Sequence, residues 1–236
     1  MSLATQMRRA AAGVSAGGFN PETSITWHSL FWAEGSGFVG EGYSNGDPVG
    51  TWPNETEETD ALSFGGLPTL TASYASLNDQ PALHFATNAV ATASSFSMNP
   101  TYPISIVMIG RVETPAAFGK MFDGTGSDRS RIYMNSPPTQ WRLFAGTARS
   151  GGTVDTNAHL WVAQFDGSTG NDTLAVDGAT VINANAGATT IQSAVIGGTP
   201  VQAYSLVGIY EGDITADGAW SDFEAWVENH YGLSIA

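Results

Sequence analysis

From about residue 80 onward, the sequence is a series of short segments rich in branched and aromatic residues, separated by clusters of Gly, Asn, Asp and Pro. This spacing is typical of an antiparallel β-sandwich or barrel, because each segment suits one strand and each cluster supplies a turn. A chain of 236 residues can also bury a full hydrophobic core in one such domain. The pattern predicts strands at residues 82–85, 104–112, 120–122, 131–135, 141–147, 159–165, 173–176, 179–182, 194–197 and 204–210.

The clearest pairing signal is the dipeptide Asp177-Gly178, which stands between two alternating segments. A tight type I′ hairpin turn requires positive φ angles at both central residues, and Asp-Gly tolerates them. The segments on either side of this turn are therefore expected to be antiparallel neighbours.

One helix is predicted near the end of the chain. Ser221 and Glu224 have the spacing of a capping box, and Phe223 and Trp226 fall on one helical face. Gly232 is expected to end the helix, because glycine readily adopts the left-handed conformation found there.

The segments at residues 104–112 and 159–165 are apolar on both alternating faces. A sandwich strand with one face in water alternates apolar and polar residues instead. Two interpretations remain open for the outer face of these strands: loops and the terminal helix cover it, or it is a surface for a partner.

The charge of the chain argues against nucleic acid as a partner. Eight basic and 22 acidic residues give a formal net charge of −14, which repels a polyanion. Six of the eight basic residues lie within residues 111–149, and we call this segment the basic island. The apolar run at residues 106–109 is far too short for a membrane span, and the absence of cysteine excludes disulfides and zinc-thiolate sites.

Two regions are expected along the chain. Residues 1–20 form an Ala-rich N-terminal assembly arm or flexible extension, which ends in Gly17-Gly18 and a turn at Asn20-Pro21. Residues 21–236 form the sandwich domain.

Over residues 27–233 the sequence resembles the concanavalin A-like lectin/glucanase jelly rolls, in particular the laminin-G-like domains of tailed-bacteriophage virion proteins. The order and spacing of several segments carry this resemblance: Val49–Asn54, Gln80–Phe85, His159–Gly167, Leu174–Gly178, and Ile209–Gly212 with the closing residues 223–233.

The resemblance implies an all-β, antiparallel two-sheet jelly roll with a short C-terminal helix. It also implies a non-enzymatic structural protein of the phage particle, either a minor tail protein or a head decoration. Such a protein would adhere to host-cell glycans or to neighbouring virion subunits, as a homo-oligomer or part of an assembly. The alternatives are a glycan-degrading jelly-roll hydrolase with an atypical site and a secreted bacterial carbohydrate-binding module.

The expectation of no catalysis rests on one strand-end motif. Glucanases of this fold place carboxylates in an E-x-D-x-x-E pattern on one strand, so that alternate side chains share a face. The nearest match here begins with Glu211 and Asp213 and has Ala216 at the third position.

A sugar site needs an aromatic face for the apolar side of a pyranose and planar polar groups for its hydroxyls. The basic island supplies both on two predicted strands. The candidate ligand-binding residues are Arg131, Tyr133, Asn135, Trp141 and Arg142.

No cofactor is expected, and calcium is the alternative, since hard cations take oxygen ligands from acidic loops. The candidate ligands are Asp123 and Asp128 in one turn and Asp166 and Asp172 in another. Asp-Gly turns also form without a metal, so ordinary turn chemistry is the alternative.

Overall fold

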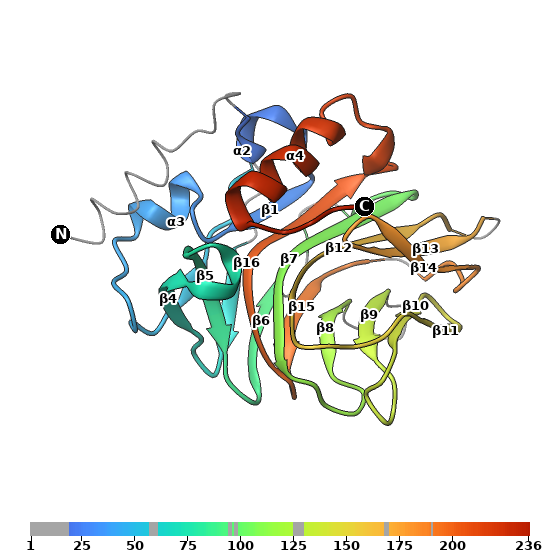
Figure 1. The fold of residues 1–236 in the computed structure, drawn as a ribbon, viewed down its shortest axis with the longest axis horizontal. Coiled ribbons are helices and arrows are strands. Elements are labelled where there is room, and N and C mark those ends of the chain that lie inside the picture. Colours follow the sequence, from blue (N-terminus) through green and yellow to red (C-terminus); the bar gives the residue numbers. More distant parts are fainter. Residues whose placement is uncertain are drawn as a thin grey trace.

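Two antiparallel β-sheets packed face to face form the body of the protein (Figure 1). The computed structural model describes residues 19–56, 61–93, 96, 99–124, 130–167, 170–189 and 191–236. The architecture confirms the predicted two-sheet sandwich with a short C-terminal helix.

The first sheet contains the longest strands of the described chain. Its strand β16 pairs with three other strands, β7, β5 and β1. Its spatial order is β14 (Ala179–Ala184), β13 (Asp172–Val176), β12 (Ala158–Phe165), β7 (Ile104–Thr114), β16 (Val201–Glu211), β5 (Gln80–Phe85) and β4 (Thr69–Tyr74), and β1 (Ser29–Trp32) pairs with the end of β16.

The second sheet contains the shorter strands and carries most of the basic island. Its spatial order is β11 (Ala148–Gly151), β10 (Trp141–Phe144), β9 (Arg131–Met134), β8 (Lys120–Asp123), β15 (Ala194–Gly198), β6 (Ala89–Ala93), β3 (Leu62–Gly65) and β2 (Thr51–Trp52).

Each of the ten strands predicted from the sequence is present, with small differences at the ends. The hairpin between β13 and β14 is also confirmed: the φ angles are 50° at Asp177 and 80° at Gly178, and Val176 is opposite Ala179. Six strands were not predicted, namely β1, β2, β3, β4, β6 and β11.

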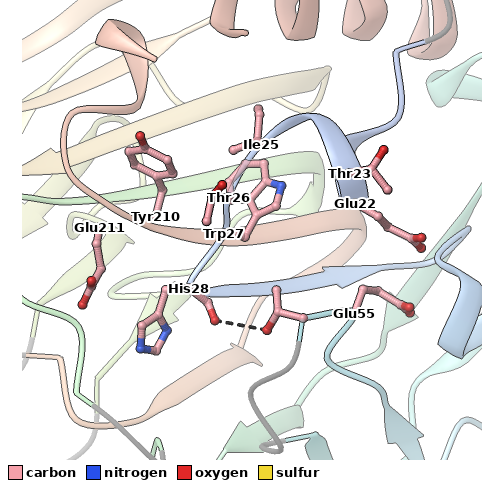
Figure 2. A pocket seen from close by; sticks show the side chains of 10 residues that line it. Glu22, Thr23, Ile25, Thr26, Trp27, His28, Glu55, Tyr210 and Glu211 are labelled. Carbon is pink, nitrogen blue, oxygen red and sulfur yellow. Dashed lines mark hydrogen bonds between the residues drawn. The ribbon is translucent and has the colours of Figure 1, made fainter. Parts of the chain in front are cut away.

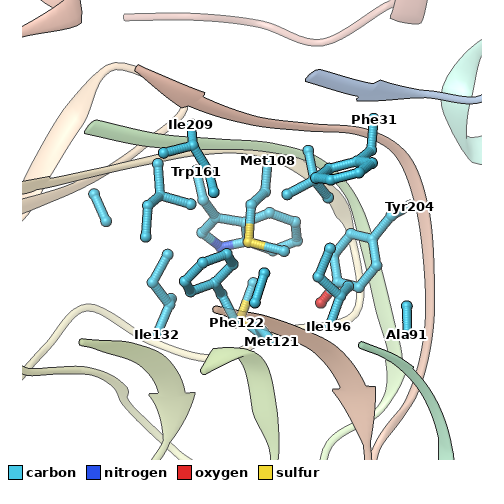
Figure 3. Packing of buried hydrophobic residues seen from close by; sticks show 14 of the residues in the cluster. Phe31, Ala91, Met108, Met121, Phe122, Ile132, Trp161, Ile196, Tyr204 and Ile209 are labelled. Atoms are coloured by element: carbon cyan, nitrogen blue, oxygen red, sulfur yellow. The ribbon is translucent and has the colours of Figure 1, made fainter. Parts of the chain in front are cut away.

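The main core lies between the two sheets (Figure 3). Met108, Trp161 and Ile209 enter it from the first sheet, and Phe122 and Ile132 enter it from the second. These side chains are fully buried, so each removes its apolar surface from water at a gain of about 25 cal/mol per Å².

A second core covers the other face of the first sheet. Val107, Leu160 and Leu206 alternate with the residues of the main core and pack under α4 (Trp220–Tyr231), whose Phe223 and Trp226 are buried there. Figure 1 shows α4 and β1 above β16 and β7. The two-faced apolar pattern is therefore explained by a cover from within the chain, as one of the two interpretations expected.

The remaining helices are single turns. They are α2 (Pro21–Ser24), α3 (Ser36–Gly40) and the 3₁₀ turns η1 (Ala75–Leu77) and η2 (Ile214–Ala216).

The start of α4 differs from the predicted capping box. The N-cap is Ala219, which makes no side-chain cap, so Ser221 already lies in the first helical turn. Asp217 instead accepts a hydrogen bond from the Ala219 amide at 2.8 Å through its Oδ1 atom. The end is as predicted, because Gly232 has a φ of 68° and donates its amide to the Glu228 carbonyl.

Residues 1–18, which make up most of the predicted arm, lie outside the described residues. In the part of the chain that the structure describes, no helix has the length and apolar character needed to cross a membrane.

We predict that Trp226→Ala lowers the free energy of unfolding by about 3 to 5 kcal/mol, because it leaves a cavity under α4. Trp226 is 4% exposed and its ring packs edge-on against Trp32 with centroids 5.9 Å apart. Urea unfolding measures the change. Ser221→Ala is the matched control and should alter stability by less than about 0.5 kcal/mol, because the exposed Ser221 does not cap the helix. Equal effects of the two substitutions would contradict this packing.

Candidate functional site

Four neighbouring strands of the second sheet carry most of the basic island, and their register decides which side chains meet. Tyr133 on β9 is opposite Lys120 on β8 and Arg142 on β10, and Arg142 is opposite Ser150 on β11. Directly opposed residues of antiparallel strands point to the same face. The adjacent Leu143 enters the core, so this row of four side chains lies on the outer face.

A second row runs beside the first. Arg131 on β9 is opposite Asp123 on β8 and Phe144 on β10. Together the two rows make a surface that we call the β8–β11 face, defined by Lys120, Asp123, Arg131, Tyr133, Arg142, Phe144 and Ser150.

The β8–β11 face carries three cations and one acid. Asp123 is buried and binds two of the cations: its Oδ2 is 2.7 Å from Lys120 Nζ, and its Oδ1 accepts from Arg131 Nε at 2.8 Å. An irregular register in β8 after Lys120 brings both of these β8 side chains to the outer face. The face is therefore electropositive on a strongly acidic protein.

Arg131 and Arg142 both lie over the Tyr133 ring, with their Cζ atoms 5.9 and 5.3 Å from its centroid, and these are favourable cation–π contacts. Arg142 differs from the other two cations of the face because it has no acidic partner among the described residues. Its Nε atom is buried and has no hydrogen-bond partner among the described residues. Burial raises the pKa of the Tyr133 phenol, and the charge of Arg142 opposes this only in part, so Tyr133 is neutral at pH 7.

The structure separates two of the predicted ligand-binding residues from the rest. Trp141 is 1% exposed and points into the core against Trp161, so its ring cannot serve as a platform for a sugar. Asn135 follows β9 and holds the turn to β10, because its Oδ1 accepts from the amides of Thr139 at 2.8 Å and Gln140 at 2.9 Å. Arg131, Tyr133 and Arg142 are the predicted residues that meet on the outer face.

An exposed aromatic residue at the rim was not predicted. Phe118 is 57% exposed and has a φ of 56°. This left-handed conformation is unfavourable for any residue other than glycine. Its amide donates to the Asn135 carbonyl at 3.4 Å, so it lies beside the end of β9. The sequence signal was a lone Phe before Gly119 in a turn between two predicted strands.

The candidate calcium ligands have other roles in the described residues. Asp123 holds the two cations of the face, and Asp172 accepts from the amides of Asp166 at 2.9 Å and Ala186 at 2.6 Å. Burial raises the pKa of the Asp172 carboxyl, while those amides oppose the shift. Asp128 lies outside the described residues. No group of three potential ligands gathers within the described ranges. Asp172 makes the hydrogen bonds of a turn, and Asp123 pairs with two cations of the β8–β11 face.

A pocket of about 670 Å³ lies elsewhere, beside α2 and the end of β16 (Figure 2). Its lining includes the carboxylates Glu22, Glu55 and Glu211 and the rings of Trp27 and His28. It contains the first residue of the glucanase-like motif considered above.

All three carboxylates in this pocket accept hydrogen bonds from backbone amides, and Glu22 accepts from the Ser36 amide at 2.5 Å. Glu55 accepts from the amides of Gly37 at 2.7 Å and Phe38 at 3.0 Å in the first turn of α3, and burial raises its pKa although these bonds oppose the shift. Glu211 accepts from the Thr101 amide at 2.9 Å. The pocket is thus built from acids with structural partners, whereas the β8–β11 face offers Arg142, a cation without an acidic partner in the part of the chain that the structure describes.

Comparisons with known proteins agree with the fold. No protein-family model matches the sequence, and no curated protein sequence matches it. A Trypanosoma rangeli sialidase bound to a difluoro sugar acid shares 12% identity and a TM-score of 0.59, over 96% of this chain and 38% of the sialidase. The binding domain of botulinum neurotoxin serotype D shares 8% identity and a TM-score of 0.58, over 89% and 54%.

A third similar structure is botulinum neurotoxin type C, with 9% identity and a TM-score of 0.55 over 77% of this chain and 51% of that one. The chain therefore spans about two fifths to one half of these neighbours. The protein has a lectin-type β-sandwich fold. The expectation of a non-enzymatic protein is contradicted, because the chains that share this fold include sialidases.

His159 on β12 contacts both the core and the hairpin turn between β13 and β14. Its ring is edge-on to Trp161, with centroids 5.3 Å apart. Nδ1 is 2.6 Å from Asp177 and Nε2 is 2.9 Å from Asp155. Burial disfavours the protonated ring, but the hydrogen bonds and charges of the two carboxylates outweigh it and raise the pKa of His159.

We predict that His159 stabilises the fold most at acidic pH. The pKa of His159 is higher in the folded state than in the unfolded state, where it is about 6.5. Protonated His159 therefore stabilises the fold fully below the unfolded-state pKa, and this stabilisation is lost as the pH rises through the folded-state pKa. Urea unfolding of the wild type and of His159→Phe, which keeps a ring, should differ more at about pH 5.5 than at about pH 8.5. Parallel profiles of the two proteins would contradict the prediction.

Proposed function

We propose that this protein is a glycan-binding module and that the β8–β11 face is its binding surface. The observation that carries the proposal is the pairing of Arg142 with the Tyr133 ring on a sheet face that no helix of the described chain covers. In the opposite sheet, the outer face of the central strands β7, β12 and β16 packs under α4.

The chemistry of the face suits a sugar. A pyranose presents an apolar side to aromatic rings and hydroxyl groups to planar polar groups. Phe144 supplies a partly exposed ring, and Ser150 supplies an exposed hydroxyl. Arg131 and Arg142 supply guanidinium groups, which lie over the buried Tyr133 ring.

The structural neighbours support this proposal without establishing it. One of the sialidase structures contains sialic acid, and cell entry of botulinum neurotoxin type C depends on interaction with two ganglioside molecules. A shared fold carries many functions, so the assignment rests on the residues of the face.

We also propose that the module belongs to the particle of a tailed phage, where it adheres to host-cell glycans or to neighbouring subunits. The support is the resemblance of the sequence segments to laminin-G-like virion domains, together with an acidic surface that favours solubility and electrostatic contact with basic partners. Mass spectrometry of purified particles tests this location. Particles that infect normally and contain no peptide of this chain would exclude it.

The sialidase neighbours favour a second candidate function, cleavage of a glycan. Its site would be the pocket with Glu211, since a carboxylate there can transfer a proton to a leaving oxygen. Reducing-sugar release from host-wall glycan that disappears in Glu211→Gln would establish this function, and no release from any glycan that the protein binds would exclude it.

For the binding function, we predict that Phe144→Ala weakens glycan affinity about tenfold, because a sugar loses one aromatic contact worth roughly 1 kcal/mol as well as buried area. The measurement is a titration with the oligosaccharide that binds best on an array of neutral and acidic glycans. Thr92→Ala is the matched control, because Thr92 lies on β6 of the same sheet, two strands beyond Asp123 and outside the set of residues that defines the face. Equal loss in both variants, or none in either, would contradict the assignment of the site.

A further inference from the structure

We propose that the β8–β11 face selects glycans that carry a carboxylate on the sugar, and that Arg142 binds this carboxylate. The inference rests on the proposed glycan-binding function and names the class of its ligand.

The first step of the argument is the unequal pairing of the three cations. Lys120 and Arg131 both contact the buried Asp123, so one carboxylate already offsets part of their charge. Arg142 has no acidic partner within the described residues. The cation that remains available on this face is therefore an arginine.

The second step is the environment of Arg142. A half-buried guanidinium group with an unsatisfied Nε atom loses hydration without a compensating hydrogen bond. The Tyr133 ring compensates only in part, because a cation–π contact engages the flat side of the guanidinium group. Because the Nε atom is itself buried, a ligand carboxylate would bind the terminal N–H groups of the guanidinium, which have no acceptor among the described residues.

The third step is geometry. A guanidinium group that rests on a ring keeps its N–H edge for other acceptors, and two parallel N–H groups match the two oxygens of a carboxylate. Ser150 lies opposite Arg142 on the edge strand β11 and is exposed, so a hydroxyl group stands beside the charge. A sugar acid bound there would have a partner for its carboxylate and for an adjacent hydroxyl.

The fourth step is the field of the whole protein. With a net charge of −14, most of the surface repels an anionic glycan, and the β8–β11 face is a local exception. Long-range attraction is weak, so selection for the acid must come from close contact with Arg142. Binding should accordingly depend on the carboxylate itself more than on the total charge of the ligand.

The test compares an oligogalacturonate with its methyl ester, which has the same sugar rings and no charge. Sialyllactose and lactose form a second pair, because uronic and sialic acids are different sources of the same carboxylate. Calorimetric titration of the wild type should give at least tenfold tighter binding of the acid than of its neutral partner in one of the pairs.

Arg142→Gln should remove this preference, so that the ratio of the affinities for the acid and for its neutral partner falls from at least about tenfold to about one. Arg111→Gln is the control, since Arg111 lies on β7 of the other sheet and the substitution changes the net charge equally. Arg142→Lys keeps the charge without the planar fork and should recover only part of the preference.

The outcomes separate the inference from the proposed function. Equal binding of acid and neutral partner by the wild type would overturn the inference and leave glycan binding standing. A preference that survives in Arg142→Gln, or that is lost equally in Arg111→Gln, would also overturn it. No binding of any sugar on the array would overturn the proposed function as well.

Discussion

The first sheet is apolar on both faces, and the rest of the structure follows from the need to cover both. Strands β7, β12 and β16 send alternate side chains into two separate cores. A sheet of this kind is stable in water only between two layers, because each exposed face would leave a large apolar area hydrated. The second sheet covers one face, and α4 with the segment around Trp27 and β1 covers the other.

This layering decides where a binding surface can lie. Since α4 occupies the outer side of the first sheet, the second sheet is the layer with an outer face toward solvent. Its strands β8 to β11 are consecutive in the chain and come from the basic island. Three cations of one short segment therefore meet on one surface, and Asp123 holds two of them while Arg142 rests on Tyr133.

The similarity to sialidases and neurotoxin binding domains is a similarity of fold at 8 to 12% identity. Such a scaffold can carry different binding sites, because the residues of its loops and outer face do not have to pack in the core. In this chain that face carries a guanidinium group with no acidic partner among the described residues, a partly exposed Phe144 ring and the exposed Ser150 hydroxyl, on a strongly acidic protein.

The sequence by itself determined the features that depend on neighbouring residues. The Asp177-Gly178 turn required an antiparallel pair, and the strands from residue 80 onward were readable because branched and aromatic residues concentrate in them. Strands such as β4, with the polar sequence TLTASY, were missed because they form through pairing with β5 and not through local preference. Only the tertiary structure decided that Arg142 faces solvent and Trp141 the core. Alternation along β10 places these two side chains on opposite faces, but the packing of one sheet on the other decides which face is buried.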